Sequence, residues 1–364
     1  MDVGTGDNLD AGIPSQNYGV LALQHYVFKK SNISAIFINR ESLGLDYTKY
    51  DSAYRKYNRE AGIEYNLASG DDKWTGKFLA HKSFSPGLSG KDYMYAGYLK
   101  YTTKPVTADG TLMYAGENFN PEVGYMPRTS FYQANFHYRY KFFVKSNWLL
   151  SHGPELKTTN YFDTSWKLTD NENRISYDFE FLDRSNFGFG YGFDYVKLQN
   201  PFDPTNSGGL AFPEGSEFHT TGWGFSYASS PSKLFTLTLN GQTGTYYNGK
   251  LSEIDGILGY RLQPYGGISV NFAYNDINLT EPYKSARFWL IGPKLDVTFT
   301  NKLFFATFLQ YNQQADNFNI NSRFQWRFAP ASDIFLVYTE NYLPGDFSTK
   351  NRAIVLKFTY WYNL

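Results

Sequence analysis

The sequence predicts an all-β protein, a transmembrane antiparallel up-and-down β-barrel of about 18–20 strands, with one or more N-terminal strands missing. Three observations lead to this fold class. Short segments alternate apolar and polar residues, tight polar turns separate these segments, and Phe, Tyr and Trp make up 20% of the 364 residues. Successive residues of a strand point to opposite faces, so each alternating segment has one apolar and one polar face.

The clearest segments place rings on one face and charges on the other. Residues 268–275 are ISVNFAYN, residues 175–181 are ISYDFEF and residues 320–328 are INSRFQWRF. A soluble β-sandwich also alternates, but the inner faces of its two sheets pack about 10 Å apart and favour Val, Ile and Leu. An apolar face this rich in rings is typical of the aromatic girdles of a membrane barrel. Because lipid then covers the apolar face, the polar face is predicted to line the lumen.

Composition excludes several other classes of protein. Mean hydropathy is −0.47, and no run approaches the ~18 apolar residues of a spanning helix. Lys plus Arg and Asp plus Glu both number 34, so no basic excess favours nucleic acid. The absence of cysteine excludes disulfides and thiol chemistry. The first residues do not form a secretory signal peptide, which indicates that this chain is part of a longer outer-membrane protein.

The predicted strands alternate between tight turns and longer loops. They cover residues 17–28, 33–41, 56–68, 73–84, 92–102, 108–119, 128–141, 148–168 (with a bulge near Gly153-Pro154), 174–183, 186–198, 219–228, 234–247, 251–261, 267–277, 286–298, 302–312, 320–328, 333–342 and 351–364. Residues 1–16 are then an N-terminal loop remnant, and residues 17–364 form the barrel. Barrels of this kind normally have an even strand number. Counted back from the C-terminus, 17–28 runs downward, so at least one upward strand before it is expected to be missing. The alternative is a strand miscounted within 141–168.

Several motifs together resemble one known family. They are IPSQNYGVL (13–21), KSNISAIF (30–37), FNPEVGYMPR (119–128), LQNPFDP (198–204), YYNG (246–249) and FNINSRFQWRFAP (318–330). In order and spacing they resemble the DUF5916 family of Bacteroidota outer-membrane proteins. The resemblance implies a barrel that usually follows a periplasmic module similar to family 9 carbohydrate-binding domains, and this chain contains no such module. Family members are often labelled membrane-associated hydrolases, but no catalytic residues carry over to this sequence.

No catalytic, cofactor or metal site is predicted. Ser151-His152 near Glu155 is the one tight local cluster that hydrolysis could use. His and acidic residues do not recur at metal-ligand spacings. Polar-face residues are instead predicted to line the lumen, where carboxylates and arginines pair across it. The lumen-facing candidates are His137, Arg139, Asp178, Glu180, Asp194, Arg323 and Arg327.

Three further features have structural or assembly roles. Alternate glycines in 186–194 fall on the inward face and are expected to relieve crowding or admit a plug or loop close to the wall. The segment 201–215 is long enough to fold over the barrel mouth. The C-terminal strand alternates apolar residues and is similar to the signal that barrel-assembly machinery recognises. Its candidate residues are Phe358, Tyr360, Tyr362 and Leu364.

The functional hypothesis is a bacterial outer-membrane barrel that acts as a channel or a surface docking barrel linked to carbohydrate handling. The expected partners are outer-membrane lipid, the barrel-assembly machinery and an oligosaccharide, with no nucleic acid and no cofactor. Two alternatives stay open. One is a membrane-associated hydrolase embedded in the barrel, and the other is a non-catalytic scaffold of an envelope complex.

Overall fold

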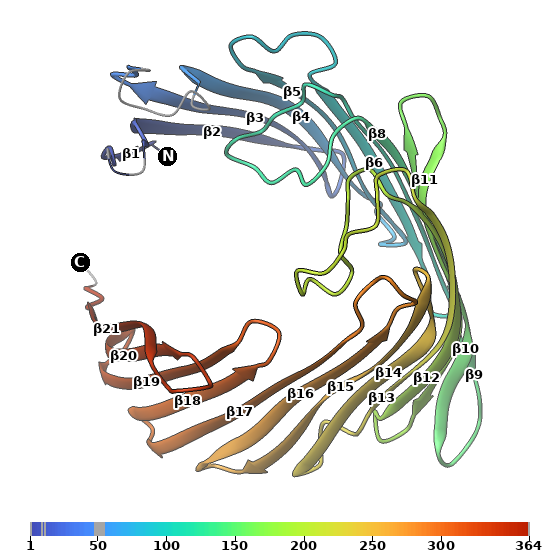
Figure 1. Ribbon diagram of the computed structural model, residues 1–364, viewed down its shortest axis with the longest axis vertical. Coiled ribbons are helices and arrows are strands. Elements are labelled where there is room, and N and C mark those ends of the chain that lie inside the picture. The colour runs from blue at the N-terminus through green and yellow to red at the C-terminus, as the bar shows by residue number, and fades with distance from the viewer. Residues whose placement is uncertain (1, 9, 11, 47–54, 363–364) are drawn as a thin grey trace. The chain divides into compact units, whose positions relative to one another are not determined.

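The computed structural model describes residues 2–8, 10, 12–46 and 55–362. Within these residues there are 21 strands, all paired antiparallel and assigned to one sheet (Figure 1). The described residues include no helix with the length and hydropathy needed to cross a membrane. Two compact units divide the chain. Unit 1 comprises Met1–Lys141 and Glu155–Arg174, and unit 2 comprises Phe142–Pro154 and Ile175–Leu364.

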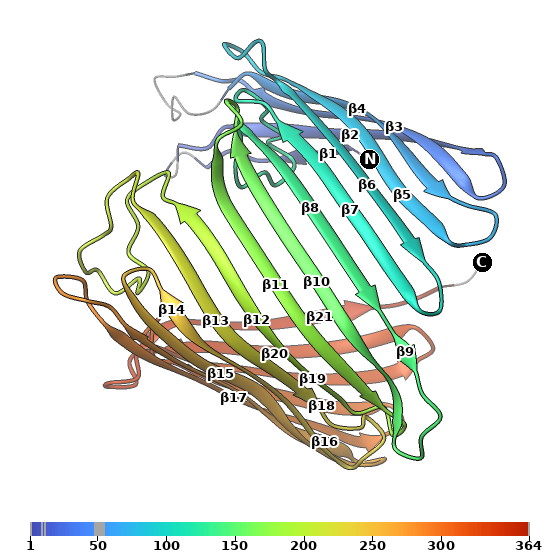
Figure 2. The same cartoon turned by 90° about the vertical axis from the view of Figure 1, so that its right-hand side faces the viewer.

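Unit 1 is built from neighbouring strands that follow one another along the chain. Its strands are β1 (Asp2–Thr5), β2 (Ser15–Val27), β3 (Ser31–Leu43), β4 (Tyr57–Ala68), β5 (Trp74–Phe84), β6 (Tyr93–Thr102), β7 (Val106–Ala115) and β8 (Phe131–Tyr140), with parts of β10 (Leu149–Asp163) and β11 (Leu168–Phe181). Strands β4 to β8 lie side by side in Figure 2. Connections at one end of the strands are short, such as 103–105, and those at the other end are long, such as 116–130.

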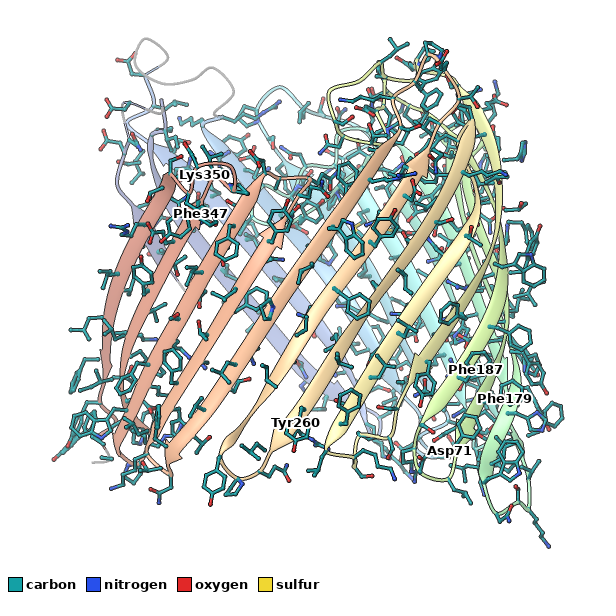
Figure 3. The ribbon with its side chains drawn as sticks, turned by 60° about the horizontal axis from the view of Figure 1, so that its bottom comes forward. Asp71, Phe179, Phe187, Tyr260, Phe347 and Lys350 are labelled. Atoms are coloured by element: carbon teal, nitrogen blue, oxygen red, sulfur yellow. The ribbon has the colours of Figure 1, made fainter. Side chains whose placement is uncertain are left out.

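Unit 2 continues the same up-and-down order. Its strands are β9 (Phe142–Phe143), β12 (Asn186–Lys197), β13 (Glu217–Ala228), β14 (Phe235–Tyr246), β15 (Gly249–Leu262), β16 (Gly266–Asn278), β17 (Ala286–Thr300), β18 (Leu303–Asn312), β19 (Asn317–Ala329), β20 (Ser332–Tyr342) and β21 (Thr349–Thr359), with the remaining parts of β10 and β11. In each unit, the end with the long connections is called the loop end and the other end the turn end. Phe347 and Lys350 lie at the loop end of unit 2, and Tyr260 lies towards its turn end (Figure 3).

Each unit has one apolar and one polar face, as the alternation predicts. In unit 2, Ile268 of β16 lies opposite Tyr260 and Leu295, whereas its neighbour Ser269 lies opposite Lys294. The rings of Phe179 and Phe187 also point away from the sheet (Figure 3). Ile268, Tyr260, Leu295 and Phe187 are exposed and Phe179 is half-buried, so these side chains are not packed between two layers. The arrangement is therefore not a sandwich.

The same division holds in unit 1. Its apolar face carries Ile63 and Leu112, which are 63% and 69% exposed. Its polar face carries Glu64, Lys77 and Asp109, which point to the opposite side because strand residues alternate. One exposed apolar face that continues across many strands is what a membrane barrel requires.

Every predicted strand has a counterpart in the structure, and two short strands were missed. β9 has two residues, and β1 lies inside the segment predicted as a loop, where Asp2–Thr5 pairs with Gln16–Gly19 of β2. The bulge predicted near Gly153-Pro154 does not end β10, which continues to Asp163. There the Asp163 carboxylate accepts hydrogen bonds from the backbone N–H groups of Ser165 and Lys167 and forms a turn.

The turns and the C-terminal strand show how local chemistry sets the strand ends. In the turn after β4, the Ser69 hydroxyl donates a hydrogen bond to Asp71. That bond, with further bonds from Lys73, lowers the pKa of Asp71 to about 2. At the C-terminus, β21 ends at Thr359, five residues earlier than predicted. Phe358 lies on the apolar face opposite Ile334. Tyr360 and Tyr362 follow as exposed rings, and Leu364 lies outside the described residues.

Candidate functional site

A network of ion pairs covers part of the polar face of unit 1. His137 Nδ1 lies 2.9 Å from Asp109 Oδ1, and His137 Nε2 lies 3.0 Å from Glu155 Oε1. Glu155, which is almost fully buried, also pairs with Arg139 and with Lys157 (2.6 Å). The predicted candidates His137 and Arg139 therefore lie together on the polar face. Their partners come from adjacent strands rather than from across the lumen.

A second imidazole lies between two carboxylates on β4 and was missed by the sequence reasoning. His81 Nδ1 is 2.6 Å from Glu60 Oε1, and its Nε2 is 3.4 Å from Glu64 Oε1, which also pairs with Lys77. Gly62 lies directly opposite His81. A Cβ at Gly62 would lie 2.6 Å from the imidazole Nε2, so only glycine leaves room for the ring. Alternating Glu60, Gly62 and Glu64 is the signal from which this cluster could have been predicted.

The predicted candidates of unit 2 also lie on the polar face. These residues are Asp178, Glu180, Asp194, Arg323 and Arg327. Glu180 accepts hydrogen bonds from Ser151 (3.3 Å) and Arg184 (3.2 Å), and Arg327 pairs with Asp333 at 3.3 Å. These partners lie on neighbouring strands or in adjoining turns.

The alternate glycines of β12 have the structural role expected of them. A Cβ at Gly188 would collide with the Asp178 carboxylate, and one at Gly190 would lie 2.9 Å from the Ser176 Cβ. Because glycine has no side chain, the polar side chains of Asp178 and Ser176 on β11 can lie directly against the backbone of β12.

The cluster considered for hydrolysis is not assembled as a catalytic site. Ser151 and His152 are consecutive strand residues and point to opposite faces. His152 Nδ1 is 2.5 Å from the Tyr177 hydroxyl on the apolar face, whereas Ser151 bonds to Glu180. Glu155 is engaged by its basic neighbours. In the described part of the chain, no group of three or more His, Cys, Asp or Glu side chains is placed to hold a metal ion.

A ladder of amides near the loop end of β19, β20 and β21 was also missed. Asn317 and Asn319 each donate a hydrogen bond of 3.0 Å to Asn341, and Asn341 donates one of 2.7 Å to Asn351. Asn321 donates to the Thr339 hydroxyl at 2.8 Å. The amide ladder thus adds neutral donors and acceptors to a face that elsewhere carries ion pairs.

Residues 198–216, here called the β12–β13 loop, fold back over the polar face of unit 2 (Figure 1). Leu251 and Ile277 lie opposite each other and continue the polar-face rows towards the loop end. Phe212 of the loop packs into this apolar patch and is 3% exposed. Its ring stacks on Tyr283 at 3.8 Å and on Tyr247 at 5.6 Å between centroids. Near the loop end, this otherwise polar face therefore carries an apolar patch, and the β12–β13 loop packs against that patch.

Asp203 organises the polar part of this loop. Its carboxylate accepts hydrogen bonds from the Thr205 hydroxyl and from the backbone N–H groups of Thr205, Ser207 and Gly209. Desolvation raises the pKa of Asp203, but these hydrogen bonds outweigh it and leave the pKa below the usual value. Gln314 Nε2 donates a hydrogen bond of 3.3 Å to the backbone carbonyl oxygen of the buried Thr205. The loop is held by its own carboxylate and by a neighbouring hairpin.

Residues 116–130, here called the β7–β8 loop, are held against the polar face of unit 1 by buried polar groups. The Arg40 guanidinium pairs with Glu122, and Asn58 Nδ2 donates to the Asn120 carbonyl at 2.7 Å. Both Arg40 and Asn58 are 2% exposed. Beyond these anchors, Tyr125 is 88% exposed. The loop thus has a fixed base and presents an aromatic residue to solvent.

Comparison with known proteins gives the fold and no family. No protein-family model and no curated protein matches the chain. Among solved structures, it is similar to the siderophore receptor PirA from Pseudomonas aeruginosa, with 12% identity, a TM-score of 0.54, and coverage of 95% of this chain and 69% of PirA. It is also similar to the open form of the ferric-catecholate import receptor Fiu from E. coli, with 9% identity, a TM-score of 0.50, and coverage of 98% and 72%. With one exposed apolar face, a polar face bearing folded loops, and this likeness, the chain has the fold of an outer-membrane β-barrel.

Proposed function

We propose that this chain is a barrel of the bacterial outer membrane through which polar, uncharged solutes pass, with oligosaccharides as the solute class. One observation carries the proposal. The β12–β13 loop is fixed against the polar face by a buried aromatic core rather than left to extend into solvent. A rigid loop that narrows a polar pathway selects solutes by size and hydrogen bonding, and binding residues are concentrated on such loops.

The chemistry of the polar face favours uncharged solutes. The amide ladder around Asn341 offers donors and acceptors that match sugar hydroxyls. Charged residues such as Glu155 are held by partners within the wall. The resemblance to the DUF5916 family supports a link to carbohydrate. The two solved neighbours are described as a siderophore receptor and an import receptor, which supports uptake as the direction of passage.

The membrane and its machinery are the partners that this proposal requires. Lipid would cover the exposed apolar face, including Ile63 and Leu112. The barrel-assembly machinery would read Phe358 and the following Tyr360 and Tyr362, which are all exposed. We propose this assembly role for the C-terminal rings together with the outer-membrane location.

Liposome swelling tests the passage of solutes. The full chain is reconstituted into vesicles, and swelling is followed in iso-osmotic sugars from monosaccharides to tetrasaccharides. We expect swelling that declines with sugar size and is absent from protein-free vesicles. Swelling in no sugar, from protein shown to be folded by its mobility on an unheated gel, would overturn passage and favour a scaffold.

A matched pair of variants tests the role of the amide ladder. Asn341→Leu removes the amide that joins the ladder, so oligosaccharide flux should fall while monosaccharide flux is retained. Leu336→Val, on the apolar face of the same strand, should leave both unchanged. Equal flux for the two variants would exclude the ladder as the sugar contact.

A further inference from the structure

A continuous row of rings crosses the apolar face of unit 1 near its loop end. Tyr95 of β6 stacks with Tyr114 of β7 at 6.3 Å between ring centroids, and Tyr114 meets Tyr132 of β8 at 4.9 Å. Tyr132 then stacks on Trp166, in the turn after β10, at 4.1 Å and an interplanar angle of 11°. Strands β6, β7 and β8 are adjacent in Figure 2. Such a row is what the aromatic girdle of a membrane barrel looks like at one interface.

A hollow lies directly beneath this row, on the side away from the loops. Two residues further along their strands, Gly97 follows Tyr95 and Ala134 follows Tyr132, so neither β6 nor β8 places a ring at the next level. The Phe78 ring of β5 lies opposite Gly97 and forms one side of the hollow. The hollow has a volume of about 370 Å³. Its lining residues include Phe78, Gly97, Leu112, Ala134, Phe162 and Trp166. A methylene group occupies about as much space as a water molecule, ~30 Å³, so the hollow has room for roughly a dozen of them.

A cation marks the headgroup side of the row. Lys82 lies on the apolar face, opposite Tyr93, and its Nζ is 4.0 Å from the Tyr93 ring centroid and 2.8 Å from Asp92 Oδ1. Tyr93 in turn stacks on Tyr95 at 6.2 Å, the first ring of the wall of the hollow. Asp92 accepts one hydrogen bond of this ammonium and balances part of its charge, and the Lys82 side chain is still 32% exposed. The ammonium lies at the loop end of the hollow. Because the long loops of outer-membrane barrels are extracellular, the headgroups of the outer leaflet would be found there.

We propose that this hollow holds one acyl chain of the phosphorylated glycolipid that forms the outer leaflet of bacterial outer membranes, with Lys82 facing its phosphate. The inference rests on the membrane location proposed above. A chain that leaves the bilayer for the hollow gains no hydrophobic free energy, because both surroundings are apolar. Retention must therefore come from the close fit of the chain beneath the rings and from the charge at the headgroup level. An outer-leaflet lipid is favoured because the hollow lies in the loop-end half of the strands.

Lipid retention tests the proposal with lipid A as the probe. The full chain is reconstituted into vesicles of phosphatidylethanolamine and phosphatidylglycerol that contain a small fraction of lipid A. Vesicle flotation measures insertion, and native mass spectrometry after mild detergent extraction measures retained lipid. We expect one lipid A per protein molecule. Ala134→Leu should fill the hollow and reduce retention at least tenfold. Lys82→Gln should reduce it by less than the about fivefold of one unpaired basic residue at a lipid surface, because Asp92 already balances part of the charge.

Two further variants keep the result decisive. Leu112→Trp fills the same hollow from a side chain that is largely exposed, so it serves if Ala134→Leu does not fold. Ile63→Leu, on the same face but outside the hollow, is the control and should retain lipid A as the unchanged protein does.

The possible failures are distinguishable. Two outcomes in protein that floats with vesicles would overturn this inference alone. The first is that the protein retains phosphatidylglycerol to the same extent as lipid A. The second is that both filling variants still retain lipid A. Protein that does not float would overturn the membrane location and the inference with it.

Discussion

Removal of the Phe212 ring should detach the β12–β13 loop from the polar face. Phe212 is 3% exposed, stacks on Tyr283 at 3.8 Å and meets the edge of Phe218 at 4.9 Å. Truncation of a buried Phe to Ala costs about 3–5 kcal/mol, which covers lost transfer free energy and the cavity that remains. Because the strands beneath keep their ladders of backbone hydrogen bonds, we expect Phe212→Ala to act on the loop and not on the barrel.

The expected magnitude follows from this cost. Each 1.4 kcal/mol is a tenfold change in an equilibrium constant, so a cost of about 3–5 kcal/mol should make the open form of the loop about 10² to several 10³-fold more populated. Backbone amides that are protected by hydrogen bonds within the loop should exchange correspondingly faster. Two such amides are the Phe202 N–H, which donates to the Phe212 carbonyl oxygen, and the Gly209 N–H, which donates to the Asp203 carboxylate. Exchange in β13 and β14 should not change. The size limit for sugar swelling should rise in parallel.

Phe202→Ala is the matched control for this experiment. Phe202 lies in the same loop and exchanges backbone hydrogen bonds with Phe212, but it is 43% exposed. Its truncation should therefore have roughly half the effect or less, since about half of its surface is already in water. If both variants accelerate exchange equally, the apolar core does not hold the loop. If Phe212→Ala leaves exchange unchanged in folded protein, Asp203 and its hydrogen bonds alone would account for the loop structure.

Three further predictions test the faces and the loops. Phe324→Arg on the apolar face should lower the free energy of unfolding by about 2–4 kcal/mol if it lies near the membrane midplane. Gln325→Arg on the polar face should leave that free energy almost unchanged, and urea titrations measure both. Equal losses for the two variants would mean that the faces are misassigned. Arg40→Met should break a buried ion pair, at about 3 kcal/mol, and expose the β7–β8 loop to protease, while unchanged cleavage would show that its other anchors suffice. Asp203 has a lowered pKa, so its contribution is present at neutral pH and is lost as pH falls below about 4. Pepsin, which is active in that range, should then cut the β12–β13 loop before any strand, and Asp203→Asn should abolish the pH dependence.

The strands could be predicted because one local rule sets them. In segments such as 268–275 successive residues alternate between the apolar and the polar face, so the period of two is visible without knowledge of any partner. The missed strand β1 has the sequence DVGT, which is too short and has no ring to show that period. The strand predicted over 148–168 ends five residues early as β10, because the Asp163 side chain caps a turn that the alternation does not reveal.

The functional residues were harder to predict because they meet across long sequence separations. Phe212 and Tyr283 are 71 positions apart, and nothing local to either position shows that their rings stack. Arg40 reaches Glu122 in the same way. The alternating Asn317, Asn319 and Asn321 could have been noticed, since a one-face row of amides is a local pattern. The pairing of that row with Asn341 depends on the register of β19 and β20.

The way in which the polar face satisfies its charges bears on which solutes it suits. A buried carboxylate is costly unless basic partners surround it, and the structure supplies them from the same strand or from adjacent strands for both histidine clusters. Glu155 has His137, Arg139 and Lys157, and Gly62 is kept bare so that His81 can reach its two glutamates. Charges that neutralise one another within the wall leave little field in the lumen, and the chain as a whole carries 34 basic and 34 acidic residues. In the proposed passage of solutes, such a wall would neither attract ions strongly nor repel them, so hydrogen bonding and the fixed loops would be the main sources of selectivity. The solutes proposed above, which are uncharged and rich in hydroxyl groups, are the class for which those two sources would suffice.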